Sequence, residues 1–267
     1  MKNIRLSTSP RDLGLVVLCK GKKLAMLQLE ITNRPGSLAE VVSVIANHKI
    51  NIVYISNSKT SCGFEETTMA SIYLDMTDVK IKPEELMAEL RKCRSVKAVE
   101  HIPEQYPGMV VDERGFPLYM IGERAVVFRM PSFTALLEGI REQFGSAGEA
   151  FLYYMGVKVG QALYNAFSEL GMLGDIEKAI THWGITHGAG LFKIVEYNPE
   201  ERRCVVRVYD LIECLGARKK GLPHSMFYRG VLEAIIGSDW GPVRAEEQKC
   251  IAAGADVCEF LITPRTD

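Results

Sequence analysis

Two cysteines, Cys250 and Cys258, have a spacing that could hold a metal ion. Gly254 lies midway between them, and the segment Ala253-Gly254-Ala255-Asp256 is typical of a hairpin turn. A hairpin centred on Gly254 places the two thiols opposite each other, with Cβ atoms on the order of 5 Å apart. Two such thiolates can share one tetrahedral zinc ion. The sequence therefore predicts a zinc site here; the alternative is a pair of reduced, partly buried cysteines without metal.

Hydrophobic periodicity predicts the elements that position this hairpin. Its strands are expected over residues 243–251 and 257–263, after an earlier hairpin over residues 191–197 and 203–211. Apolar residues at helical spacing predict helices over 132–145, 147–170, 173–182 and 225–236, with a break near Gly145. A short strand pair is expected within residues 116–130.

The segment from Glu247 to Phe260 resembles the carboxy-terminal signature of the 4-vinyl reductase domain: glutamate, cysteine, glycine, cysteine and an aromatic residue, in that order. The helices that contain Gly156, Gly160 and Gly230 fit the same family, so the resemblance covers roughly residues 115–260. It implies an α/β fold with a buried, mostly apolar ligand cavity. The family occurs in sensors of aromatic compounds and in proteins linked to chlorophyll pigment reduction.

The resemblance also implies zinc ligands. Sensor members of the family hold zinc with the equivalents of Glu247, Cys250 and Cys258 and with one upstream cysteine. Glu247 lies an odd number of residues from Cys250 and would point to the opposite face of a regular strand, so its ligation requires a β-bulge. Glu246 has the right parity but does not match the family pattern. Four protein ligands would make the zinc structural.

The upstream ligand is where this chain departs from the family pattern. No cysteine lies at the start of the Gly230 helix, where His224 and Ser225 are found. Histidine is a good zinc ligand, so we expect His224 to supply the fourth position. Ser225 and Cys214 are the alternatives.

Aromatic residues of the second half of the chain could line the implied cavity: Phe144, Phe151, Tyr154, Tyr164, Trp183 and Phe192. We expect Tyr154, Trp183 and Phe192 to contact an apolar or aromatic ligand. The alternative is that these side chains are ordinary core residues.

The first hundred residues show a different order of elements. Alternating apolar residues predict strands over 24–32, 50–55, 68–76 and 96–102, and helical spacing predicts helices over 38–45 and 83–93. Strand–helix–strand–strand–helix–strand is the ferredoxin-like split βαββαβ unit. The fold class is therefore α+β, with an α/β domain of antiparallel sheet and helices following the ferredoxin-like one.

With the loop between its first strand and first helix, this unit resembles the ACT domain over roughly residues 24–103. ACT domains are regulatory modules that typically bind amino acids where two copies pair. The resemblance implies a homodimer and a ligand site in the loop, at Asn33, Arg34, Pro35, Gly36, Ser37 and Leu38. A helix amino terminus attracts a carboxylate, and Gly36 allows close approach to the backbone. Many ACT loops carry aspartate at Asn33; in the alternative interpretation the loop is only a turn and the domain only dimerises.

A segment rich in proline, glycine and charge separates the two halves. We therefore expect an ACT-like domain over residues 1–104, a linker over 105–117 and a 4-vinyl reductase-like domain over 118–267.

Composition excludes several classes of protein. The net charge of -1 argues against direct nucleic-acid binding, and the apolar stretches are too short to span a membrane. Seven cysteines without a secretory signal argue against a disulfide framework and for a cytoplasmic protein. The leading hypothesis is a non-enzymatic, ligand-binding regulatory or sensor protein that acts through an unidentified protein partner. An enzyme or enzyme subunit of the vinyl-group reductase type and an interaction adaptor are the alternatives, although no catalytic constellation or redox cofactor motif is readable.

Overall fold

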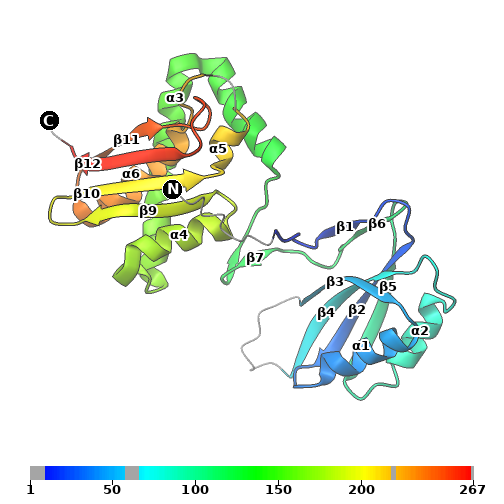
Figure 1. The fold of residues 1–267 in the computed structure, drawn as a ribbon. Coiled ribbons are helices and arrows are strands. Elements are labelled where there is room, and N and C mark those ends of the chain that lie inside the picture. The colour runs from blue at the N-terminus through cyan, green and yellow to red at the C-terminus, as the bar shows by residue number, and fades with distance from the viewer. Residues whose placement is uncertain (1–9, 58–65, 218–220, 266–267) are drawn as a thin grey trace. The chain divides into compact units, whose positions relative to one another are not determined.

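The computed structural model describes residues 10–57, 66–217 and 221–265, and the chain forms two compact units, Met1–Val126 and Val127–Asp267. Both units consist of helices packed on antiparallel sheets (Figure 1). The predicted α+β class is confirmed.

A four-stranded antiparallel sheet in the order β3-β4-β2-β5 forms the centre of the first unit. Its strands are β2 (Leu24–Thr32), β3 (Asn51–Asn57), β4 (Thr67–Asp75) and β5 (Val96–Pro103). One face is covered by two helices, α1 (Ser37–Asn47) and α2 (Pro83–Leu90). Alternate residues of β2, including Leu27 and Leu29, are fully buried in the core that includes residues of both helices, which explains the period-two pattern.

The other face of this sheet is covered by a two-stranded ribbon, β1 (Val16–Leu18) paired with β6 (Met109–Val111). Its apolar side chains pack over Met26 and Tyr73, which are fully buried. The Tyr73 hydroxyl donates a hydrogen bond of 2.8 Å to the carbonyl of Gly14. Both faces of the sheet are therefore apolar and covered.

The ribbon changes the expected domain boundary. The first unit continues to Val126 rather than ending at residue 104, and the segment 105–117 contributes β6 instead of serving only as a linker. Two further short strands, β7 (Tyr119–Met120) and β8 (Glu123–Arg124), pair with each other. The first unit extends beyond residue 104 because the second face of its sheet is apolar and must be shielded from water, which the β1–β6 ribbon does.

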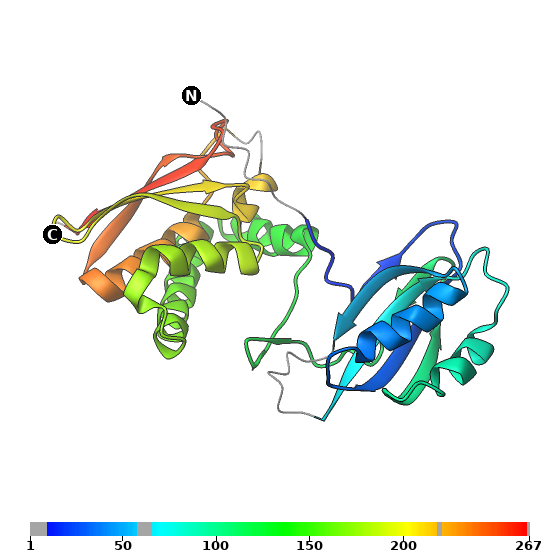
Figure 2. The same ribbon diagram turned by 60° about the horizontal axis from the view of Figure 1, so that its bottom comes forward.

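The second unit is a four-stranded antiparallel sheet, in the order β11-β12-β10-β9, with helices on one face (Figure 2). The strands are β9 (Leu191–Asn198), β10 (Arg203–Tyr209), β11 (Val243–Lys249) and β12 (Cys258–Pro264). The helical segments are α3 (Met130–Glu169), η1 (Leu173–Asp175), α4 (Ile176–Thr186), α5 (Ile212–Leu215) and α6 (Met226–Trp240). Helix α3 is interrupted at Gly145, where φ is 54° and ψ is -128°, close to the predicted break.

Helices α3 and α6 pack with their backbones in close contact. A Cβ placed on Gly156 would lie 1.9 Å from the carbonyl oxygen of Phe227, and one on Gly230 would lie 2.2 Å from the carbonyl oxygen of Tyr153. Only glycine allows such an approach, since backbone atoms cannot move aside as side chains do. These glycines therefore set the distance between the two helices.

We predict that Gly156→Ala lowers the free energy of unfolding of the second unit by about 1–3 kcal/mol or more, because overpacking usually has an effect of this size. Gly139→Ala is the matched control, because Gly139 is also in α3 but has open space around its Cβ position. This control should gain up to about 1 kcal/mol from helix propensity. Urea unfolding followed by tryptophan fluorescence measures both, since Trp183 and Trp240 lie in the second unit. Equal stabilities of the two variants would contradict the proposed backbone contact.

Candidate metal centre

Four potential metal ligands meet at the end of the β11–β12 hairpin: Cys214, Glu247, Cys250 and Cys258. Their ligand atoms all lie within 4.8 Å of one another, and the Sγ atoms of Cys214 and Cys250 are 3.6 Å apart. Thiolates on one tetrahedral zinc ion, with bonds of about 2.3 Å, lie about 3.8 Å apart. The donor types and their spacing therefore fit a zinc ion.

A β-bulge in β11 allows Glu247 and Cys250 to lie on the same side of the hairpin. The pairing of β11 with β12 shifts between Glu247, which is opposite Phe260, and Lys249, which is opposite Glu259. One residue is thereby left out of register, which turns the following residues to the other face. Phe260 is fully buried, so its partner Glu247 lies on the core side, as does Cys258. The bulge that the sequence required for Glu247 is present.

Backbone hydrogen bonds hold the turn that follows Cys250, and one backbone N–H is directed at a sulfur of the cluster. The carbonyl oxygen of Cys250 accepts hydrogen bonds from the N–H groups of Ala253 (3.1 Å) and Ala255 (3.0 Å). The N–H of Ile251 is directed at Cys258 Sγ at 3.4 Å. A donor aimed at sulfur stabilises the charged form of a thiolate.

His224, the residue expected to supply the fourth ligand, is not part of this cluster. Its Nε2 lies 2.5 Å from Oε1 of Glu138 on α3. Cys214, one of the alternatives, occupies the fourth position instead. Ser225 lies against the cluster, with its hydroxyl donating to Glu247 at 2.5 Å and 3.1 Å from the sulfur of Cys214.

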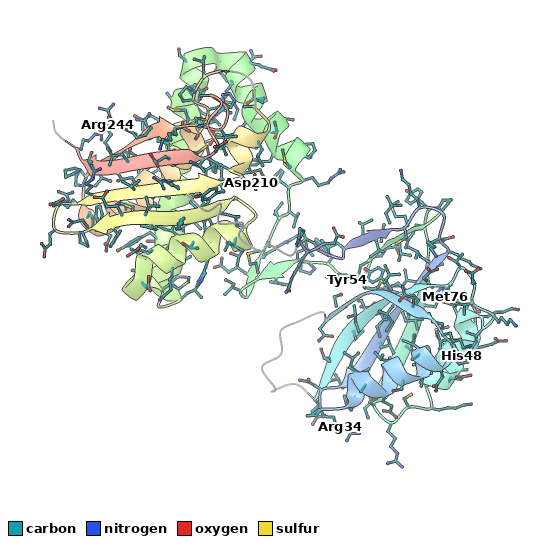
Figure 3. The ribbon with its side chains drawn as sticks, viewed as in Figure 1. Arg34, His48, Tyr54, Met76, Asp210 and Arg244 are labelled. Atoms are coloured by element: carbon teal, nitrogen blue, oxygen red, sulfur yellow. The ribbon has the colours of Figure 1, made fainter. Side chains whose placement is uncertain are left out.

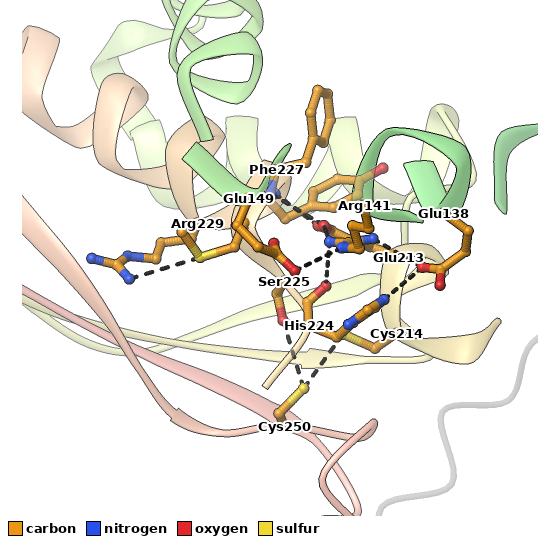
Figure 4. Close-up of polar contacts among 12 residues, drawn as sticks. Glu138, Arg141, Glu149, Glu213, Cys214, His224, Ser225, Phe227, Arg229 and Cys250 are labelled. Carbon is orange, nitrogen blue, oxygen red and sulfur yellow. Dashed lines mark hydrogen bonds and ion pairs between the residues drawn. The ribbon is translucent and has the colours of Figure 1, made fainter. Parts of the chain in front are cut away.

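A network of charged side chains supports the cluster from the helical side (Figure 4). The guanidinium of Arg141 donates to Glu149 at 3.0 Å, to Glu138 at 3.1 Å and to Glu213 at 2.5 Å. It also donates to the carbonyl of His224 at 3.0 Å. Because Arg141 precedes the kink of α3 and Glu149 follows it, the network joins both halves of that helix to the segment entering α6.

Glu213 links this network to the metal ligands, since Cys214 is the next residue. Its side chain is fully buried and accepts hydrogen bonds from the N–H groups of Phe227 (3.2 Å) and Tyr228 (3.1 Å) in the first turn of α6. Burial raises the pKa of Glu213 to about 7, although Arg141 and the two N–H groups favour its charged form. The carboxylate thus serves as a cap for α6.

Without metal, the cluster holds protons. Burial raises the pKa of Glu247 to about 8. Hydrogen bonding with Cys250 raises the pKa of the Cys214 thiol, while hydrogen bonding from Cys214 lowers that of Cys250. A divalent cation bound to these groups would displace their protons.

The three aromatic residues predicted to bind a ligand do not form one site. Trp183 and Phe192 are buried, with ring centroids 5.4 Å apart, and both pack against Tyr228 at 6.1 and 6.2 Å. Tyr154 is 67% exposed on α3 and lines a surface pocket that includes neither of the other two. Trp183 and Phe192 therefore contribute to the core.

The predicted ligand loop of the first unit connects β2 to α1. Arg34, Pro35, Gly36 and Leu38 are exposed, whereas Ser37 is buried and its hydroxyl lies 3.1 Å from that of Thr32 (Figure 3 labels Arg34). The N–H of Asn33 donates to the carbonyl of Glu66 at 2.8 Å. Gly36 caps α1 with φ of 91°, and nothing lies within 4 Å of its Cβ position. The loop thus leaves open space at a helix amino terminus.

Arg141 and Glu213 support the cluster, but the sequence analysis did not predict a role for either residue. A signal was present: Arg141 is four residues after Leu137 and seven before Gly148, so it lies on the buried face of α3. A charged residue at such a position requires buried partners of opposite charge. The partner's identity could not be read in the same way, since Glu213 belongs to a distant short helix.

Comparison with known proteins identifies part of the chain. The family model for the ACT domain matches residues 22–100. This part of the chain is an ACT domain. No curated protein sequence matches the chain. Among the described residues, no helix combines the length and apolar composition needed to cross a bilayer.

Several solved structures are similar to this chain. The phenol-responsive sensory domain of the transcription activator PoxR, with phenol, is 13% identical with a TM-score of 0.49, over 55% of this chain and 79% of that one. A vinyl-4-reductase family protein from Methanocaldococcus jannaschii is 18% identical with a TM-score of 0.39, over 53% and 85%. The ACT domain from GTP pyrophosphokinase of Chlorobium tepidum is 19% identical with a TM-score of 0.24, over 30% and 99%.

The identity of the fourth ligand can be tested by metal content. We predict that Cys214→Ser reduces bound zinc from about one per chain to a small fraction, because a tetrahedral site loses one thiolate. His224→Gln should retain its zinc, and Cys93→Ser in the first unit is the control for a general cysteine effect. Elemental analysis of the purified variants measures the outcome. Zinc loss in His224→Gln but not in Cys214→Ser would reverse the assignment.

The buried charge network makes a second prediction. Arg141→Met should destabilise the second unit by about 3–5 kcal/mol, because it leaves Glu213 buried without its cation. Adding Glu213→Gln, which removes the charge, should recover much of this loss. Arg207→Met is the control: Arg207 pairs with Glu259 at the sheet surface and should contribute less than about 1 kcal/mol. Urea unfolding measures these three variants and Glu213→Gln alone, and additive effects of the Arg141 and Glu213 changes would argue against their coupling.

Proposed function

We propose that this protein is a small-molecule-responsive regulator whose ACT domain binds an α-amino acid and whose second unit is stabilised by zinc. The observation that carries this proposal is the match of residues 22–100 to the ACT domain. ACT domains are regulatory modules, and the loop before α1 has the exposed glycine and helix amino terminus that amino-acid binding requires.

The roles of the loop residues follow from their chemistry. The first turn of α1, at Leu38, presents the positive end of the helix dipole to a ligand carboxylate, while the N–H of Ser37 donates to the carbonyl of Arg34 at 3.2 Å and holds the loop. Gly36 leaves space for the ligand beside the backbone. The Asn33 side chain offers an amide oxygen that can accept a hydrogen bond from an amino group. Pairing of two ACT domains would complete the site, so we propose a homodimer.

For the second unit, we propose a structural zinc ion held by Cys214, Glu247, Cys250 and Cys258. Four protein donors fill a tetrahedron and leave no position for a substrate, so the role of the ion is structural. It would fix the β11–β12 hairpin to α5 and thereby to the start of α6. An apolar ligand among Trp183, Phe192 and Tyr228 would have to separate rings that are packed together.

Regulation requires the ligand to bind one arrangement of the protein more tightly than another. The signal would then pass to a protein partner.

Amino-acid binding is tested by calorimetric titration of the full-length protein with each standard amino acid. We expect one or a few to bind saturably, and Gly36→Ala to weaken this binding at least about tenfold, since the methyl group strains a backbone with positive φ and fills the open space. Gly21→Ala is the matched control, because Gly21 has φ of 78° and nothing near its Cβ position. Absence of binding by every amino acid would refute this part of the proposal.

The structural role of zinc is tested by removing it with a chelator. We expect the second unit to lose stability, seen as a lower melting temperature by tryptophan fluorescence, because a metal bound only to the folded state stabilises that state. Adding back one equivalent of zinc should restore the melting temperature of the native protein but not that of Cys258→Ser. A protein purified with zinc whose melting temperature is unchanged by the chelator would show that the ion is not structural.

A further inference from the structure

A surface pocket of about 410 Å³ lies in the second unit, away from the four metal ligands. Its walls come from α3, α6 and the paired strands β11 and β12. The lining contains three arginines, Arg229 of α6, Arg244 of β11 and Arg265 just after β12, together with the rings of Tyr153 and Tyr154. Arg244 projects from β11 at the edge of the sheet (Figure 3). Arginines that converge from separate elements on one hollow indicate a site for a negatively charged group.

The acidic residues of the pocket are already engaged. Glu233 is 8% exposed and accepts hydrogen bonds from the Tyr153 hydroxyl and, at 2.8 Å, from the N–H of Ala245. Glu246 forms an ion pair of 3.1 Å with Arg244. Three arginines against two carboxylates leave the lining with one excess positive charge.

Arg229 is the side chain that lacks a matching partner. Its guanidinium lies over the ring of Tyr153, with 5.7 Å between the guanidinium carbon and the ring centroid, and contacts Met226 Sδ at 3.9 Å. Its Nε is buried and has no hydrogen-bond partner, and no carboxylate of the described residues forms an ion pair with it. The charge of the Arg229 guanidinium, which no carboxylate of the described residues pairs with, favours an anion supplied from outside the chain.

We propose that this pocket binds a small organic anion, in which a carboxylate or phosphate is attached to a planar apolar body. The guanidinium groups of Arg229 and Arg265 would hold the anionic group, since the arginine fork matches two oxygens of carboxylate or phosphate. Tyr153 and Tyr154, whose ring centroids are 5.3 Å apart in an edge-to-face arrangement, would contact the apolar body. This site goes beyond the proposed function, because it involves neither the metal ligands nor the ACT domain.

The location gives such a ligand an effect on the fold of the second unit. Tyr153 on α3, Glu233 on α6 and Ala245 on β11 are joined by the hydrogen bonds of Glu233 at the pocket wall. A ligand that contacts Arg229 and Tyr153 would bridge α3 and α6 beside their glycine contact at Gly230. Binding therefore stabilises the junction of the two helices with the sheet edge.

The test is calorimetric titration of the full-length protein with phenyl phosphate, benzoate, inorganic phosphate and the neutral analogue benzyl alcohol. We expect phenyl phosphate or benzoate to bind saturably and more tightly than inorganic phosphate, and benzyl alcohol not to bind. Arg265→Gln and Arg229→Lys should each weaken binding of the preferred anion at least about tenfold, since each removes charge-assisted hydrogen bonds.

Arg203→Gln is the control for loss of a surface arginine, because Arg203 pairs with Glu196 on the sheet and does not line the pocket. Arg265 follows the last strand and is exposed, so its variant keeps the test valid if Arg229→Lys folds poorly. The proposal is overturned if neither aromatic anion binds saturably, or if Arg203→Gln weakens binding as much as Arg265→Gln. Equal affinity for inorganic phosphate and phenyl phosphate would overturn the role of the tyrosine rings.

Discussion

The second unit depends on the contacts of one buried carboxylate, that of Glu213. It caps the first turn of α6 through two N–H groups and pairs with Arg141 on α3, and it precedes Cys214 in the chain. A fully buried carboxylate is unfavourable unless its partners are fixed. The position of α5, the entry into α6 and the first half of α3 therefore follow from satisfying this one group.

The same constraint prepares the metal centre. With Glu213 held by α6, the sulfur of Cys214 is directed toward the end of the β11–β12 hairpin, where Glu247 lies on the core side and the bulge places Cys250 on that side as well. Ser225, at the beginning of α6, lies against both Cys214 and Glu247. The four side chains thus come from α5 and from the β11–β12 hairpin, two segments that are distant in the sequence and are brought together by the fold.

The two units position their candidate sites in different ways. In the ACT domain, the loop before α1 lies between a central strand and a helix, and the Glu40 carboxylate on that helix holds the turn at Arg94 and Ser95 with hydrogen bonds of 3.0 and 3.1 Å. In the second unit, polar side chains from distant segments converge on the site. A site of the first kind follows from local order along the chain, whereas one of the second kind exists only in the folded unit.

This difference explains what could be read from the amino-acid sequence by itself. Periodicity determined the βαββαβ order, the two later hairpins and the break of α3 near Gly145, because each depends on neighbours within a few residues. The cysteine spacing and the parity of Glu247 likewise indicated a bulge in β11. Which of His224 and Cys214 lies beside Cys250 and Cys258 depended on tertiary structure: Cys214 joins the cluster, whereas the imidazole of His224 contacts Glu138 of α3. The ribbon of β1 with β6 and the contacts of Arg141 with Glu213 and His224 were also decided there, since each joins segments more than sixty residues apart, whose contact no local pattern encodes.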